Sequence, residues 1–104
     1  MFIQLQITYP SREDAQNTAK FLVSSRLAAC AQIVSNIESR YVWQGETCVD
    51  TETLLLCKTR EELFSIVAEE VAKLHPYECP QIVALPIAYI SESYAKWLNE
   101  NVKD

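Results

Sequence analysis

The segment His75-Pro76-Tyr77-Glu78-Cys79-Pro80 holds the densest group of potential metal ligands in the chain. Imidazole, carboxylate and thiolate groups suit a transition metal such as copper or zinc, so His75, Glu78 and Cys79 are candidate ligands. The two prolines make the segment rigid. A structural interpretation stands beside this one, because a histidine at the end of a helix is stabilised there by the helix dipole.

Glu52 and Lys58 form a second pair of charged candidates, six residues apart on one face of a predicted strand. They indicate either an ion pair, across strands or between subunits, or the charged wall of a pocket. Phosphate-binding loops need several glycines, and Gly45 is the only one. A single histidine without a placeable orienting acid or oxyanion hole predicts no catalytic site, so the chain is predicted not to be an enzyme.

The charge balance argues against nucleic acid as a partner. The formal net charge is -5, and the nine Lys and Arg residues are scattered. The alternating N-terminus is not the pattern expected of a signal peptide, and no apolar stretch reaches membrane-spanning length. We therefore expect a cytoplasmic protein whose four cysteines are reduced and, lacking a CxxC pair, form no zinc knuckle.

Hydrophobic periodicity predicts one α+β domain over residues 1–104. Ser11 caps the first helix, Thr59 opens a second capping signature, His75-Pro76 ends the second helix, and Ser91 or Ser93 caps a short third one. Strands are predicted at residues 2–9, 30–44, 46–58 and 81–90, and the first helix at residues 12–27. The order βαββαβ plus a C-terminal helix predicts a ferredoxin-like fold, with Pro86 on an edge strand or in a bulge.

The central hairpin, which turns at Gln44-Gly45, is long for so short a chain. A strand over residues 31–44 extends about 46 Å at roughly 3.3 Å per residue, against a domain diameter of roughly 34 Å. Tyr41, Val42 and Trp43 would then project into water, which is typical of an assembly surface. The alternative is two short strands that break at Ser35-Asn36. We favour the projecting arm, because Asn36 fits a bulge within a continuous hairpin.

Several short motifs together resemble the CutA family of divalent-cation tolerance proteins, over nearly the whole chain. They are Arg26-Leu27-Ala28-Ala29-Cys30-Ala31, Ser39-Arg40-Tyr41-Val42-Trp43-Gln44-Gly45, Lys58-Thr59, His75-Pro76-Tyr77-Glu78-Cys79-Pro80 and Tyr94-Ala95-Lys96-Trp97. The resemblance implies a tight homotrimer of ferredoxin-like subunits, similar to PII signalling proteins, with strands of neighbouring subunits joined edge to edge. It also implies binding or tolerance of copper or another divalent cation, and no catalytic activity.

The resemblance also implies a ligand set and a pocket. Some bacterial members have proposed copper ligands at the positions of Ile7 and Leu74, so only His75 remains here. The recurrent positions expected in an inter-subunit pocket are Cys30, Tyr41, Trp43, Glu52, Lys58, His75 and Tyr77. The predicted function is a cytosolic homotrimer for divalent metal tolerance. The alternative is a PII-like sensor or scaffold that binds a metabolite or a protein without metal.

Overall fold

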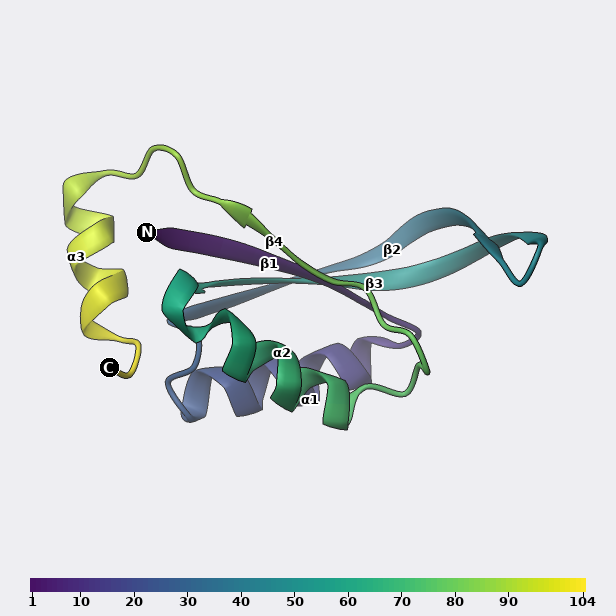
Figure 1. Ribbon diagram of the computed structural model, residues 1–104, viewed down its shortest axis with the longest axis horizontal. Helices are drawn as coiled ribbons and strands as arrows, with labels where there is room; N and C mark the ends of the chain where they lie inside the picture. Colours follow the sequence, from purple (N-terminus) through teal and green to yellow (C-terminus); the bar gives the residue numbers. More distant parts are fainter.

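A four-stranded antiparallel sheet organises the computed structural model, which describes residues 1–104 (Figure 1). The strand order β2-β3-β1-β4 and the chain order confirm the predicted α+β, ferredoxin-like arrangement with a C-terminal helix. The strands are β1 (Phe2–Tyr9), β2 (Cys30–Trp43), β3 (Glu46–Arg60) and β4 (Ile82–Pro86). The helices are α1 (Arg12–Ser24), α2 (Phe64–Leu74) and α3 (Glu92–Glu100), with a 3-10 turn η1 (Glu61–Leu63) before α2.

The core lies between the sheet and two helices. Both α1 and α2 cover the same face of the sheet, and the other face has neither (Figure 1). The predicted alternation of β1 is confirmed, since Ile3, Leu5, Ile7 and Tyr9 are buried in the hydrophobic core. None of the three helices combines the length and the apolar character that crossing a membrane requires.

Helix α1 begins as predicted but ends early. Ser11 caps it by accepting a hydrogen bond from the backbone N–H of Asp14 at 3.2 Å. The helix ends at Ser24 and not at residue 27, because Arg26 adopts a positive φ of 61° and turns the chain. The residues after this turn, Leu27 and Ala28, are buried in the core and lead directly into β2.

Thr59 does not cap the second helix, and that prediction was wrong. Strand β3 continues to Arg60, so Thr59 is fully buried in the sheet. Its hydroxyl donates instead to the carbonyl oxygen of Leu27 at 2.7 Å. The turn η1 follows Arg60 without a side-chain cap, and α2 begins only at Phe64. A residue typical of a cap thus ties β3 to the segment before β2.

Strand β4 is shorter than the predicted 81–90 and ends at Pro86. It lies at the edge of the sheet, as the proline predicted, with Pro86 opposite Ile3 of β1. The N–H of Ile87 still donates to the carbonyl oxygen of Phe2 at 2.9 Å, and the chain then leaves the sheet toward α3.

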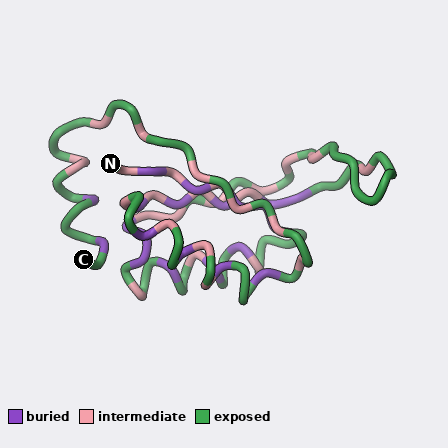
Figure 2. Tube along the Cα trace, viewed as in Figure 1, coloured by how far each residue is buried: buried purple, intermediate pink, exposed green.

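The hairpin of β2 and β3 is long and continuous, as predicted. The pairing shifts register between Val34 and Ile37, where Asn36 has a φ of 62°, so the bulge interrupts the ladder without ending it. Gln44 and Gly45 form the tip with φ angles of 50° and 81°, the positive values that a tight two-residue turn requires. The hairpin projects past the helices to the right in Figure 1, and its outer part is almost entirely exposed in Figure 2. We call this outer part, residues 38–51, the arm.

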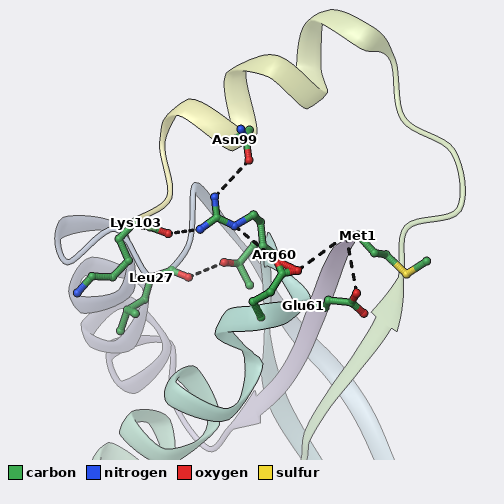
Figure 3. Close-up of polar contacts among 8 residues, drawn as sticks. Met1, Leu27, Arg60, Glu61, Asn99 and Lys103 are labelled. Carbon is green, nitrogen blue, oxygen red and sulfur yellow. Dashed lines mark hydrogen bonds and ion pairs between the residues drawn. The ribbon is translucent and has the colours of Figure 1, made fainter.

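The opposite end of the sheet is held by polar contacts around Arg60 (Figure 3). Its guanidinium donates to Asn99 Oδ1 at 3.2 Å and to the carbonyl oxygen of Lys103. The amino group of Met1 lies 3.8 Å from a carboxylate oxygen of Glu61. These contacts join both chain ends to the end of β3. We call the group the closed end: Met1, Arg60, Glu61, Glu62, Asn99 and Lys103.

Candidate functional site

A cleft of about 590 Å³ lies where the arm meets the loop after α2. Its volume is within the range that small-molecule sites occupy. The hairpin, the end of β1 and the loop each contribute to it, and we call it the arm cleft. Its lining residues are Thr8, Ser39, Arg40, Tyr41, Trp43, Glu52, Pro76, Tyr77, Glu78, Cys79 and Gln81.

The structure gathers most of the predicted site residues in this cleft. Four predicted pocket residues line it, together with two of the three candidate metal ligands. They are Tyr41, Trp43, Glu52 and Tyr77 from the pocket, and Glu78 and Cys79 from the metal set.

Cys30 and Lys58 do not reach the arm cleft. They lie opposite each other where β2 and β3 are paired nearest the closed end. Lys58 lies six positions after Glu52 on the strand, which corresponds to about 20 Å at roughly 3.3 Å per residue. Lys58 Nζ donates to Gln32 Oε1 at 2.9 Å, and within one chain it forms no ion pair with Glu52. Within one chain, therefore, Lys58 and Glu52 do not line the same pocket.

Glu52 is the most buried charged group at the cleft. The residue is 7% exposed, and its Oε2 accepts a hydrogen bond from the Tyr77 hydroxyl at 2.7 Å. No Lys, Arg or His nitrogen lies within 4.0 Å of its carboxylate, and its Oε1 accepts no hydrogen bond from the chain. No buried side-chain oxygen of the chain lacks a hydrogen-bond partner, so the second oxygen of Glu52 is in contact with solvent at the cleft.

Two tyrosines present neutral hydroxyl groups at the cleft. Burial raises the pKa of Tyr77 strongly, and its hydrogen bond to Glu52 raises it further. The hydrogen bond to Asp50 raises the pKa of Tyr41 to about 12. Both phenols therefore stay protonated at neutral pH and donate their hydrogen to a carboxylate. The rings themselves remain uncharged walls of the cleft.

His75 is buried beside the cleft and does not line it. Its Nδ1 accepts a hydrogen bond from the backbone N–H of Tyr77 at 3.1 Å, so the hydrogen of the neutral ring is on Nε2. That Nε2 donates to the carbonyl oxygen of Thr8 at 2.7 Å, and the ring stacks on Tyr9 with centroids 4.4 Å apart. Burial lowers the pKa of the imidazole, which favours this neutral form.

The predicted metal ligands do not converge. Both ring nitrogens of His75 are occupied by backbone groups, while Glu78 and Cys79 line the cleft without it. The chain has no group of three or more His, Cys, Asp or Glu side chains placed to hold a metal ion. As arranged here, His75, Glu78 and Cys79 do not fit a divalent metal site. The structural interpretation of His75 fits its contacts, because the ring fastens the loop to β1.

Some residues at the cleft were missed by the sequence analysis. Arg40 lines the cleft, and its Nε forms an ion pair with Glu38 Oε2 at 2.8 Å. Asp50 holds the Tyr41 hydroxyl. A signal for Asp50 was present, because it lies two residues from Glu52 and so shares its face of β3. Thr8 gave no such signal, since it acts through its backbone carbonyl group.

Comparison with known proteins gives consistent matches over almost the entire chain. The family model described as "CutA1 divalent ion tolerance protein" matches residues 3–101. The chain is 53% identical to the divalent-cation tolerance protein CutA of Thermus thermophilus, over 91% of this chain and 92% of that protein. It is 39% identical to the chloroplastic protein CutA of Arabidopsis thaliana, over 98% of this chain but only 56% of that longer protein.

Solved structures give the same result. The divalent cation tolerance protein of Thermus thermophilus superposes with a TM-score of 0.96 at 50% identity, over 99% of this chain and 100% of that chain. The periplasmic divalent cation tolerance protein CutA of Archaeoglobus fulgidus superposes with a TM-score of 0.95 at 38% identity, with the same coverage.

Proposed function

Since this chain belongs to the CutA1 divalent ion tolerance family, we propose that it supports tolerance of divalent cations as a cytoplasmic homotrimer. The family is described by tolerance and not by a reaction, so the proposed role is that of a binding protein without catalytic activity. Copper is the cation that the family resemblance suggests. The cytoplasm is proposed from the sequence alone.

The observation that supports assembly most strongly is the apolar face of the sheet that α1 and α2 leave uncovered. The pairing register places alternate residues of all four strands on this open face. Val34, Val83 and Leu85 are between 43% and 49% exposed there. Gln4 and Gln6 of β1 lie on the same face, between the apolar residues of β3 and those of β4. Large apolar side chains exposed together on a sheet face are typical of a surface that another protein covers. The apolar side chains of the open face are Val34, Leu54, Leu56, Val83 and Leu85.

The arm supports the same proposal. Val42 is 69% exposed and Val49 is 49% exposed on one side of it, while Tyr41 and Trp43 are exposed on the other. A two-stranded hairpin without a covering layer is only marginally stable in water. Other copies of the chain that cover both sides would bury these residues and stabilise the hairpin.

The two edge strands provide a way to join copies. β2 and β4 each have a row of main-chain groups without a partner strand on their outer side. When such different edges pair from copy to copy, the contact is heterologous, and it forms a ring where the rotation between copies closes. The number of three subunits comes from the family resemblance, and the ring geometry is compatible with it.

The predicted ligands of one chain do not converge. The tolerance proposed here is therefore not based on a closed metal site within one subunit. The arm cleft supports the second candidate function, a small-molecule sensor, since its volume and aromatic lining suit a small organic ligand. The two functions differ in whether a divalent cation must bind for the protein to act.

A growth assay tests the proposed function. A bacterial host that lacks its own gene of this family would be grown in graded Cu²⁺ and Zn²⁺ while it expresses this chain. Wild type should raise the metal concentration that halves growth. Val42→Glu should abolish that protection, because it places a charge in the proposed interface. Val23→Glu on the exposed side of α1 is the matched control and should protect like wild type.

Two results would overturn the proposal. If wild-type protein at normal levels gives no protection against any divalent cation, the tolerance function is wrong. If Val42→Glu is monomeric and still protects fully, tolerance does not depend on assembly.

A further inference from the structure

The C-terminal residues lie apart from the sheet and the two helices that cover it. Helix α3 lies across the end of the sheet, away from both α1 and α2 (Figure 1). We call residues 92–104, which comprise α3 and the residues after it, the strap. We propose that the strap opens and closes as one unit over the start of β2 while the sheet stays folded. This inference goes beyond divalent cation tolerance and does not depend on it.

Few apolar side chains fasten the strap to the rest of the chain. Among its residues only Leu98 and Val102 are buried, and Tyr94 packs against the core only in part. Trp97 is the largest side chain of the strap and is 42% exposed. A segment with little buried apolar surface opens at a lower free energy than the core does. A helix of nine residues is also unstable on its own in water, so α3 should unfold when it leaves the sheet.

Two arginines from outside the strap hold it in place. Arg26 Nη2 donates to the carbonyl oxygen of Glu100 at 2.8 Å. The Arg60 guanidinium donates to the carbonyl oxygen of Lys103 and, at 3.2 Å, to Asn99 Oδ1 (Figure 3). The N–H of Lys103 in turn donates to the carbonyl oxygen of Arg26 at 2.8 Å. Because all these hydrogen bonds need the strap in one position, we expect them to form and break together.

The closed strap also stabilises an unfavourable backbone conformation at Arg26. This residue has a φ of 61°, a left-handed value that is unfavourable for any residue with a Cβ atom. Its side chain and its carbonyl oxygen both have partners in the strap. The residues that follow, Leu27 to Ala29, are buried and lead into β2. The strap is therefore coupled to the turn from which β2 begins.

Tyr94 places the strap over the start of β2. Burial and the neighbouring Cys30 thiol raise the pKa of the Tyr94 hydroxyl, so this hydroxyl lies beside Cys30. Cys30 is the first residue of β2. The closed strap therefore keeps Tyr94 against the beginning of the strand, and an open strap would release it.

Hydrogen exchange of the full chain in its native assembly, followed residue by residue by NMR, tests this inference. The protection factors of the α3 amides should be at least about tenfold lower than those of β1. The Lys103 amide is hydrogen-bonded to Arg26 and reports on the last residues of the strap. If the strap opens as one unit, this amide should have the same protection factor as the amides of α3.

Two glycine variants separate the effect of the strap from that of backbone strain. Arg26→Gly relieves the left-handed conformation but removes the guanidinium that holds Glu100. It should lower the protection factors of the α3 and Lys103 amides at least about tenfold, and change those of β1 by less than about threefold. Gln44→Gly is the matched control, because Gln44 also has a positive φ, 50°, but lies at the tip of the arm. It should leave the protection of α3 unchanged.

Four results would overturn the inference. They are α3 amides as well protected as those of β1, a Lys103 amide far less protected than α3, unchanged α3 protection in Arg26→Gly, and an equal loss in Gln44→Gly. The first would mean that the strap opens only when the whole chain unfolds, as it would if a neighbouring copy covered it. The second would mean that the end of the chain frays without α3. The growth assay and the native mass are measured separately, so failure here leaves the tolerance proposal standing, and the reverse also holds.

Discussion

The two ends of the sheet differ in how many of their charged and apolar groups find partners within one chain. At the closed end, the Arg60 guanidinium is only 17% exposed and has partners on Asn99, Lys103 and Glu62 (Figure 3). At the arm end, Glu52 is buried with a single hydrogen-bond donor and no cation. One chain is sufficient to build the closed end. The arm end lacks a partner for both its charge and its apolar surface.

The burial of apolar side chains differs between the two ends in the same way. Leu98 and Val102 are buried at the closed end, whereas Val42 and Trp43 are exposed on the arm. A substitution at the closed end should therefore change the stability of one chain, and a substitution on the arm should change what the chain binds. The following predictions test this distinction, from the largest expected effect to the smallest.

Trp43→Ala should weaken assembly by about 2–4 kcal/mol per subunit, because buried tryptophans dominate interface energies. Trp97 on α3 has almost the same exposure in one chain, 42% against 43%, but lies at the other end of the molecule (Figure 1). Trp97→Ala should therefore weaken assembly by a clearly smaller free energy. Sedimentation equilibrium over a dilution series measures both dissociation constants. Equal losses would contradict the distinction between the two ends.

Arg60→Met should lower the free energy of unfolding by about 2 kcal/mol, because it removes charge-assisted hydrogen bonds from a largely buried position. Arg40→Met makes the same chemical change on the arm, where the side chain is 69% exposed and paired only with Glu38. Its cost should stay below about 0.5 kcal/mol. Urea unfolding at one fixed protein concentration compares them. A larger loss of unfolding free energy in Arg40→Met than in Arg60→Met would contradict the distinction between the two ends.

Stability should fall as pH drops below about 6.5, the ordinary pKa of the imidazole. The folded state lowers the pKa of His75, so in this range the unfolded chain binds a proton that the folded chain does not. Protonation of Nδ1 would also break the hydrogen bond from the Tyr77 N–H. Since His75 is the only histidine, His75→Gln should flatten the pH dependence between about pH 7 and pH 5. An equally steep decline in the variant would show that another group titrates.

Thr59→Val should cost about 1 kcal/mol of unfolding free energy, because it leaves the buried carbonyl oxygen of Leu27 without the Thr59 hydroxyl donor. Thr47→Val is the matched change on the arm, where the side chain is exposed. It should change the free energy of unfolding by less than about 0.5 kcal/mol. Thermal unfolding at equal concentrations distinguishes the two, and matching losses would count against the buried hydrogen bond.

Local sequence patterns were sufficient to predict most of the fold. The alternation in β1, the cap at Ser11 and the turn at Gln44-Gly45 each depend on residues close together in the chain, and the structure confirms all three. The role of Thr59 could not be predicted in this way. Its partner, the carbonyl oxygen of Leu27, is 32 residues away and is brought near only by the fold.

The candidate site was predictable by residue type but not by arrangement. Tyr41, Glu52 and Tyr77 meet in one cleft because the hairpin and the loop after α2 pack together. Two features of the arrangement within one chain differ in how far the sequence indicates them. The distance between Lys58 and Glu52 follows from strand geometry and was available from their spacing. The contacts of His75 were not, because its partners are backbone groups, which leave no mark in the sequence.

The most direct test of the central claim, that other copies complete the arm end, is the native mass of the protein at micromolar concentration. Light scattering behind a sizing column gives this mass without a shape assumption. We predict a mass three times that of the 11.9 kDa chain, and the mass of a single chain for Val42→Glu. A wild-type mass of a single chain would contradict the account.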